Sequence, residues 1–433
     1  MKFVINLDRE TYEAFVEQNP YKSHYLQSYA WGQFCKKDKN FIPHYVGLMD
    51  EKESLVAATL LLQKKLPFEY SYFYIPRGFV MNMDDFDLVK EFVFHLKQYG
   101  KKQKAIFIKL DSDIILHQED CDGNPIKLPY DGMKILENLK KLGFHHLGFT
   151  KNFDLNQPRY TFRIDFQKPL EEVENHFSKT TKQRIKKAED LGIEVKIATE
   201  KDIPTFYELM RITEDRKSFI THGIQYYEDL YRIWREHNSC EIFLGIAHLD
   251  RMIKDQIEKK EILELELEPL LKEEKRSKSQ NMKKKELEKQ LEKIESDIQK
   301  YKEYQNKYGD QVTLSAHFII EYGNKAWVLY AGNHNILSET YANYKTYKSH
   351  IEYYYHKGIQ IYDQFGTIGD LKKENPLYGL HEFKKKFGGD YVEMIGEFDL
   401  ILNQPMYFAF QKFIPAYRKM KFQMTKKKIK KES

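Results

Sequence analysis

Hydrophobic residues recur along the chain at two spacings, about two residues and about 3.6 residues. The first spacing predicts strands and the second predicts helices. In the first 150 residues we therefore expect a strand at 3–7, a helix at 9–18, a strand at 44–48, a hairpin of strands at 55–63 and 70–75, a helix at 85–99, a strand at 105–110, a helix at 134–142 and a strand after Gly143.

The rest of the chain repeats this order, which favours a duplication over a chance arrangement. We predict an α/β (α+β) protein with two similar domains, residues 1–150 and 151–415. In each, a tyrosine-rich strand precedes a glycine, at Gly78 and at Gly332. The second series comprises a strand at 194–198, a helix at 203–210, a strand at 241–247, a hairpin at 312–321 and 326–330, a helix at 339–356, a strand at 359–362, a helix ending at 387–389 and a strand at 391–395.

The predicted order of elements is that of N-acetyltransferase-like (GNAT-like) domains, an analogy of fold that carries no function by itself. Those enzymes hold the pyrophosphate of acetyl-CoA in a glycine-rich loop, Gln/Arg-x-x-Gly-x-Gly/Ala. Neither half of this chain contains that loop. We therefore expect neither CoA nor another cofactor.

Residues 249–309 interrupt the second series and predict an inserted arm. Between 249 and 308 there is no glycine, and the one proline is Pro269. The hydrophobic spacing predicts an antiparallel coiled-coil hairpin roughly 40 Å long. Its expected seam consists of Ile253, Ile257, Leu263, Leu267 and Leu270 in the first helix and Leu287, Leu291, Ile294, Ile298, Tyr301 and Tyr308 in the second.

The tip of this arm is basic, which suits contact with RNA phosphates. A solvated, salt-bridged helix surface explains the same residues equally well. The residues that we consider for tRNA contact are Lys275, Arg276, Lys278, Lys283 and Lys284, with Lys272 and Lys285 beside them.

Composition narrows the class of protein. Hydrophobic residues make up 41% of the chain, which predicts a packed protein, and a net charge of +5 is too small to imply a polyanionic partner. Cys35, Cys121 and Cys240 are widely separated, so we expect no disulfide framework and no metal site. The N-terminal sequence does not predict a signal peptide, and no apolar run has bilayer length, so we expect a cytoplasmic protein.

Two further segments are basic. Residues 178–187 predict the start of a helix, capped by Ser178 or Thr180, that could bind phosphate or simply face solvent. Residues 416–433 form a basic tail, which suits peripheral contact with anionic lipid headgroups or a solvated end.

Several short stretches together resemble a known family, the FemA/FemX-type peptidyltransferases, over about residues 1–415. That resemblance implies an aminoacyl-tRNA donor and an acceptor amine on the stem peptide of a peptidoglycan precursor, either lipid II or UDP-MurNAc-pentapeptide. The stretches are Tyr72-Phe73-Tyr74 with Arg77-Gly78, Gly143-Phe144 with His146 and Gly148-Phe149, Lys151 with Phe153-Asp154, Tyr330-Ala331-Gly332, and Glu382-Phe383-Lys384-Lys385 with Phe387-Gly388-Gly389.

The resemblance also implies catalytic residues. Lys384, after Phe383, matches a lysine implicated in stabilising negative charge, and Asp111 matches an aspartate considered as base or binding group. Asp363 lies at the equivalent strand end in the second half. Without the resemblance, Lys384 is one lysine in a solvated helix end and Asp111 a turn residue.

Residues for substrate binding follow in the same way. Lys36 matches a lysine placed after a tryptophan to meet precursor phosphates, although its distance from Trp31 is one residue longer here. Arg77 could hold phosphate or carboxylate. The other matches are Tyr226, Tyr330 and Gly332, with His222 where a family member has arginine.

Two alternatives remain open at this stage, a CoA-dependent N-acyltransferase and a non-catalytic RNA-binding protein built around the arm. The sequence likewise leaves open the transferred amino acid (Gly, Ser or Ala) and the oligomeric state, for which a homo-oligomer is one option.

Overall fold

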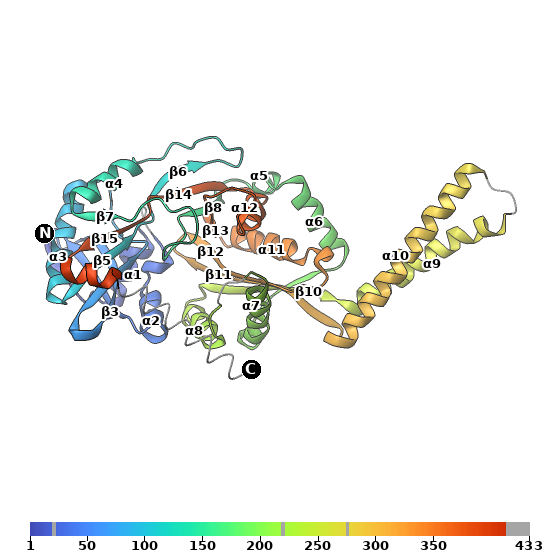
Figure 1. The fold of residues 1–433 in the computed structure, drawn as a ribbon, viewed down its shortest axis with the longest axis horizontal. Coiled ribbons are helices and arrows are strands. Elements are labelled where there is room, and N and C mark those ends of the chain that lie inside the picture. Colours follow the sequence, from blue (N-terminus) through green and yellow to red (C-terminus); the bar gives the residue numbers. More distant parts are fainter. Residues whose placement is uncertain (20–22, 218–220, 274–276, 413–433) are drawn as a thin grey trace.

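A computed structural model describes residues 1–433 except 20–22, 218–220, 274–276 and 413–433. Figure 1 shows a body of two sheets covered by helices, from which a long pair of helices projects. No helix in the described ranges is long and apolar enough to cross a membrane.

The first sheet is seven-stranded and is built mainly from the N-terminal part of the chain. Among its described pairs, β4 and β5 run parallel, and the others are antiparallel. In spatial order it contains β1 (Lys2–Val4), β2 (Ile42–Met49), β3 (Leu55–Lys65), β4 (Ser71–Pro76), β5 (Ala105–Asp111), β15 (Glu397–Ile401) and β7 (Phe144–His146).

The second sheet is eight-stranded and has a matching layout, since β12 and β13 form its parallel pair among the strands described. The position of this pair corresponds to that of β4 and β5, as expected for duplicated domains. In spatial order the sheet contains β6 (Ile115–Glu119), β14 (Asp390–Met394), β8 (Tyr160–Asp165), β13 (Ile361–Thr367), β12 (Lys325–Asn333), β11 (Gln311–Tyr322), β10 (Cys240–His248) and β9 (Glu194–Ile197).

The helices begin where the sequence supplies a cap. Asp8, Ser28, Asp85 and Ser178 each accept a hydrogen bond from the first turn of the helix that follows. The helical segments with complete bounds are α1 (Arg9–Glu17), η1 (Tyr25–Gln27), α2 (Tyr29–Asp38), η2 (Pro67–Glu69), α3 (Phe86–Lys102), α4 (Gly132–Lys141), α5 (Leu170–Asn175), α6 (Lys179–Asp190), η3 (Glu200–Asp202), α7 (Ile203–Lys217), α8 (Ile224–Arg235), α9 (Leu249–Lys272), α10 (Lys278–Tyr308), η4 (Ser338–Thr340), α11 (Ala342–His356) and α12 (Tyr378–Lys385).

The two sheets exchange strands, which the hydrophobic pattern did not predict. β6 pairs with β14 in the second sheet, and β15 pairs with β5 in the first. The chain therefore crosses between the sheets on both sides of residue 150, where we expected a simple division. The exchanged strands are only five residues long, too short for a distinctive period.

The junction between the two halves is itself a hydrophobic core. One buried cluster includes Trp31 and Phe34 of α2 together with Tyr226 and Trp234 of α8 and Trp327 of β12. Gln27 of η1 crosses into the first sheet, where its side chain donates to Pro76 O and accepts from Thr59 and Leu60 N. Those hydrogen bonds brace the first half, whereas the packing cluster contains residues of both halves and joins them. A hydrogen bond from Arg77 Nη2 to Pro158 O also connects the two halves.

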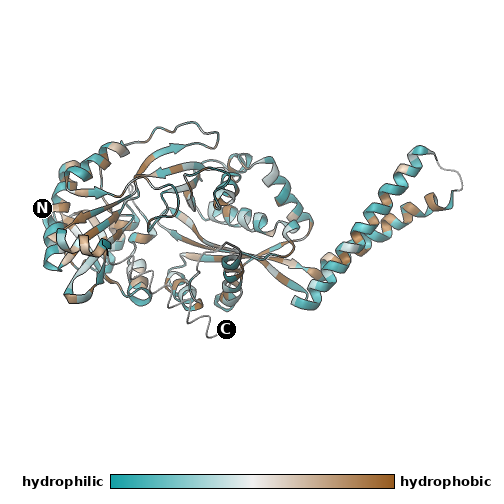
Figure 2. Cartoon of the chain, viewed as in Figure 1, coloured by the Kyte–Doolittle hydropathy of each residue, from teal (hydrophilic) through white to brown (hydrophobic). Residues whose placement is uncertain are grey.

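The arm is the predicted helical hairpin, with α9 and α10 as its two helices. Figure 2 shows it as mainly hydrophilic, with hydrophobic bands. The seam of α10 lies where expected, and Leu287 and Tyr301 are buried. In α9 the position expected for Ile257 is wrong, because its side chain is exposed. The seam passes through Lys260 instead, whose Nζ pairs with Glu295 across the hairpin at 2.7 Å.

A buried row of polar side chains lies between β11, α11 and β13. His317 contacts Asn343 Oδ1 at 2.7 Å through Nε2 and His350 Nε2 at 2.9 Å through Nδ1. His350 Nδ1 contacts the Tyr362 hydroxyl at 2.5 Å. Burial lowers the pKa of His317 to about 4 and that of His350 well below its usual range, so both rings are neutral near pH 7.

This row predicts sensitivity of the fold to acid. The unfolded His317 binds a proton as pH falls below about 6.5 and the folded residue does not until about 4, so its contribution to stability is lost across that window. Between pH 7 and pH 5 this difference in proton binding should lower the free energy of unfolding by about 2 kcal/mol. Urea unfolding should show the loss, and His317→Asn should make the pH slope shallower. An equal slope in both proteins would contradict the assignment.

Candidate active site

Asp111 ends β5 at the edge where β4, β5 and β15 meet. It lies opposite Pro76 of β4 and Glu397 of β15. Its carboxylate accepts hydrogen bonds from Arg77 N, at 3.0 Å, and from the Tyr74 hydroxyl, and Arg77 Nε lies 3.6 Å away. Burial raises the pKa of Asp111 to about 7, with Arg77 opposing this shift and Glu397 adding to it.

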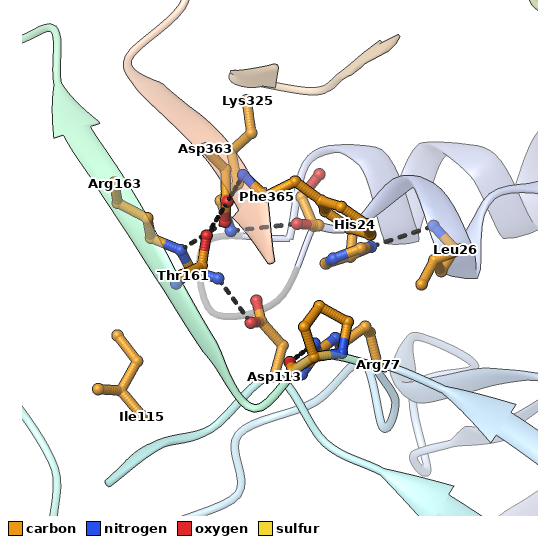
Figure 3. A network of polar contacts seen from close by, with 12 residues as sticks. His24, Leu26, Arg77, Asp113, Ile115, Thr161, Arg163, Lys325, Asp363 and Phe365 are labelled. Carbon is orange, nitrogen blue, oxygen red and sulfur yellow. Dashed lines mark hydrogen bonds and ion pairs between the residues drawn. The ribbon is translucent and has the colours of Figure 1, made fainter. Parts of the chain in front are cut away.

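A second carboxylate, that of Asp113, follows β5 of the first sheet and pairs with Arg163 of β8 in the second sheet. Arg163 Nη2 lies 2.7 Å from Asp113, and its Nε lies 2.9 Å from Asp363 of β13. Figure 3 shows the guanidinium between the two carboxylates, with His24, Arg77 and Lys325 around them. Although burial would raise the pKa of Asp113, Arg163 and other cations hold it well below its usual range.

Lys384 of α12 is buried beside the same strand. Its Nζ donates to the carbonyls of Phe365, at 2.8 Å, and Gly366, at 2.7 Å, which follow Asp363 in β13. Burial lowers the pKa of Lys384 to about 7, an effect that Asp363 opposes. The side chain therefore changes charge near neutral pH instead of remaining a fixed cation.

A short path connects Asp111 to Lys384. Arg77, which holds Asp111, also donates through Nη2 to Pro158 O at 2.7 Å. Pro158 packs against Gly366, where a Cβ would lie only 2.7 Å from the proline side chain, so glycine is required for this close approach. Gly366 in turn accepts the Lys384 hydrogen bond. Asp111 and Lys384 therefore lie on one path of contacts, in which packing of Pro158 on Gly366 joins the polar network of Asp111 and Arg77 to the hydrogen bonds of Lys384.

An aromatic group occupies the junction between α2, α8 and β12. The hydroxyls of Tyr226 and Tyr330 lie 2.8 Å apart, and the His222 ring stacks on Tyr226 with centroids 3.7 Å apart. Lys39 Nζ lies 4.9 Å from the centre of the Trp31 ring and 5.7 Å from that of Tyr226. Burial, with Lys39 adding to it, lowers the pKa of His222 to about 4.

Some predicted residues lie outside these two groups. Lys36 is exposed on α2, and Lys39, one helical turn further along, faces the aromatic group instead. Phe383 packs in a core cluster against Tyr344 and Phe387. Gly332 packs against the α7 backbone, since a Cβ there would lie 2.8 Å from Leu209 C.

The predicted tRNA-binding residues are spread over the arm tip. Lys275 and Arg276 lie outside the described residues. Lys278 is exposed, Lys283 pairs with Glu266 at 3.4 Å, and Lys284 pairs with Glu288 at 3.5 Å. Two of the described lysines therefore have carboxylate partners on the arm itself.

Several residues of the two groups were not predicted as site residues, among them His24, Lys39, Asp113, Arg163 and Lys325. Arg163 falls at a polar position in the alternation of Tyr160–Asp165, which predicts a solvent-facing side chain, so its buried partners were not predictable from the pattern. His24 and Lys39 had no signal in the sequence, since the contacts that bring them to the site, with Trp327 and with Tyr226, involve residues of the other half of the chain.

Comparisons with known proteins agree with this architecture. A lipid II:glycine glycyltransferase of Staphylococcus aureus strain MRSA252 is 29% identical over 441 residues, covering 98% of each chain, and that of strain USA300 is 28% identical over the same length. A crystal structure of FemX matches with a TM-score of 0.75 and 27% identity, covering 94% of this chain and 99% of that chain. The model of the FemAB family matches residues 7–414, so the protein belongs to the FemAB family.

Proposed function

We propose that the protein transfers glycine from glycyl-tRNA to an amine on the stem peptide, or on the growing cross-bridge, of lipid II. The observation that carries this proposal is that the buried residues Asp111 and Lys384, whose pKa values both lie near 7, lie on one path of contacts through Arg77, Pro158 and Gly366. The relatives named lipid II:glycine glycyltransferase support glycine as the amino acid and lipid II as the acceptor.

The reaction is attack of an amine on an aminoacyl ester. A C–N bond forms, the C–O bond to the tRNA ribose breaks, the amine loses a proton and the ribose oxygen gains one. The ester is already activated, so no covalent enzyme intermediate is needed. The protein has to align the substrates, accept the proton and stabilise the oxyanion.

Asp111 is suited to accept the proton. An ordinary aspartate with a pKa near 3.9 is a weak base toward an ammonium group. Burial raises the pKa of Asp111 to about 7, which brings its basicity close to the working pH while leaving a large fraction ionised. The hydrogen bond from Arg77 N fixes its orientation.

Lys384 is suited to stabilise the oxyanion. When protonated, its Nζ places a cation in a buried site, where an electrostatic interaction is stronger than in water. The carbonyls of Phe365 and Gly366 hold the amine in place through two hydrogen bonds. Phe383 contributes by packing in the core and fixing α12, one residue before the lysine.

The aromatic group is suited to bind the acceptor. Lys39 supplies a cation for a phosphate or carboxylate, and the rings of Tyr226 and His222 supply a flat apolar surface. Tyr25 connects this group to the surroundings of Asp113, since its ring lies 5.7 Å from the Trp31 ring and 4.9 Å from the His24 ring, measured between centroids. A substrate bound at the aromatic group would therefore reach toward Asp111.

The arm is suited to hold the tRNA body away from the reacting ester. The 31 residues of α10 span about 46 Å at the usual helical rise. Lys278 and Lys283 lie in the first two turns of α10. The end of the arm at which α9 and α10 meet is the part most distant from the sheets (Figure 1). Lysines there could contact the phosphates of a bound tRNA.

The direct test supplies lipid II, tRNA, synthetases and one labelled amino acid at a time. The expected product is lipid II heavier by one or more glycine residues, detected by mass spectrometry, and only when tRNA is present. Transfer from acetyl-CoA, or tRNA binding without any transfer, would contradict the proposal.

Replacing Lys384 should separate catalysis from folding. Lys384→Met fills similar volume but removes the cation, so kcat should fall by about 10²- to 10³-fold. Lys385→Met is the matched control, because that neighbouring lysine is exposed. Circular dichroism should show both variants folded. Near-normal turnover by Lys384→Met would refute its role.

The two near-neutral pKa values predict a narrow pH optimum. Activity should rise with pH through about 7 as Asp111 loses its proton and fall above about 7 as Lys384 loses its own. Lys384→Arg should extend the alkaline limb, because a guanidinium stays charged. Asp111→Asn should lower kcat by about 10²- to 10⁴-fold. Profiles of kcat/KM from about pH 5 to 9 would show this, and a flat wild-type profile would contradict it.

Shortening the arm should impair the use of tRNA but not the fold. Lys260 and Glu295 face each other across the hairpin, so a short glycine-serine linker can replace residues 261–294. The root of the arm, where Met252 and Tyr301 pack with the body, stays intact. We expect a Tm within a few degrees of wild type and KM for glycyl-tRNA raised at least tenfold. An unchanged KM would exclude a tRNA role for the arm.

A further inference from the structure

The end of the first sheet opposite Asp111 carries an exposed apolar and basic surface, which we call the basal patch. At this end β3 stops at Lys65, β4 starts at Ser71 and β5 starts at Ala105, in register with one another. β15 also ends here, opposite Phe107. The patch consists of Ile42, Lys65, Phe68, Lys102, Lys104, Phe408 and Lys412.

Its hydrophobic side chains are unusually exposed. Phe68 is 89% exposed and Phe408 is 61% exposed, while Ile42 is 43% exposed. Phe68 and Glu69 both have positive φ, 59° and 62°, so the turn holds two non-glycine residues in the left-handed region. Such a conformation has an energetic cost, and here it presents a phenylalanine to solvent.

A buried aromatic cluster connects Phe68 and Phe408. Leu66 and Tyr70, on either side of Phe68, pack with Phe107. Tyr407 and Phe410, on either side of Phe408, belong to the same cluster. The turn and the helical residues 404–412 therefore border one apolar support, and the two exposed rings rise from neighbouring segments.

Lysines surround these rings. A shallow hollow of about 410 Å³ beside Phe68 is lined by three lysines, Lys65, Lys102 and Lys104, and by one acidic residue, Glu69, which pairs with Lys104. Lys412 Nζ lies 4.6 Å from the centre of the Phe408 ring. The chain beyond Lys412, residues 413–433, adds eight lysines and arginines and one acidic residue in sequence.

We propose that the basal patch docks the protein on an anionic phospholipid bilayer, with Phe68 and Phe408 entering the headgroup region and the lysines of the hollow meeting lipid phosphates. Aromatic rings beside lysines suit the bilayer interface, where each ring is buried and each cation meets a phosphate. The excess of positive charge opposes pairing of this surface with the same surface of a second copy.

The inference rests on the proposed function in one respect, because a lipid-linked acceptor must be reached from the bilayer surface. Asp111 lies at the other end of β5, about 20 Å from its first residue at the usual rise per residue. A protein docked by the basal patch would therefore hold its polar network above the membrane, and the headgroup of the acceptor would extend up to it.

Vesicle co-sedimentation of the full chain tests the surface. Wild-type protein should bind vesicles of phosphatidylglycerol and phosphatidylcholine more tightly than vesicles of phosphatidylcholine alone, and added salt should weaken binding. The double variant Phe68→Ser with Phe408→Ser should bind at least tenfold more weakly. Replacing Lys65, Lys102 and Lys104 with Glu should weaken vesicle binding by about fivefold or more for each lysine.

Matched controls make these results specific. Phe94→Ser removes a phenylalanine that is 54% exposed on α3 and does not belong to the cluster beneath the patch. Reversing Lys285, Lys289 and Lys293 on the arm changes the same amount of charge at exposed positions. Both controls should bind within twofold of wild type.

Three outcomes would overturn the proposal. The first is that the wild-type protein fails to bind anionic vesicles, and the second is that the patch variants bind them as tightly as the wild-type protein does. The third is that the patch substitutions abolish self-association in mass photometry but leave vesicle binding unchanged. Turnover separates this proposal from the proposed function. The turnover of the patch variants should fall at least fivefold when lipid II is supplied in vesicles and should equal that of the wild type when lipid II is supplied in detergent. Vesicle binding by a protein with no turnover in detergent would refute only the transfer reaction.

Discussion

The site depends on Arg163, whose guanidinium forms one ion pair with Asp113 and another with Asp363. A buried guanidinium is tolerated only where carboxylates balance it, and here they come from the segment after β5 and from β13. Removing Arg163 would leave two buried carboxylates without the cation that lies between them. The contact therefore fixes how the halves of the molecule meet, and the proposed catalytic residues lie along that junction.

The exchange of β6 and β15 reinforces the same junction. Because each sheet contains a strand from the other half of the sequence, the two sheets cannot separate without breaking main-chain hydrogen bonds. Burial at such a junction explains why the pKa of Asp111 rises and that of Lys384 falls. Groups that would be fixed charges at a surface become able to exchange protons near neutral pH.

The proposed interaction surfaces lie at separate places around this junction. The arm leaves the second sheet between β10 and β11, and the basal patch lies at the end of the first sheet remote from Asp111. In the proposed reaction one surface would hold a large polyanionic donor and the other a lipid bilayer. Their separation would allow both to be engaged while the ester and the amine meet at the network.

The sequence by itself determined most elements, the repeated order, the length of the arm and the matches for Asp111 and Lys384, because these depend on local periodicity and short motifs. It did not determine the strand exchange, the seam position of Lys260 or the substitution of Lys39 for Lys36 at the aromatic group. Those depend on partners distant in sequence. The near-neutral pKa values of Asp111 and Lys384 were likewise decided only by burial in the tertiary structure, since side chains alone carry their ordinary values.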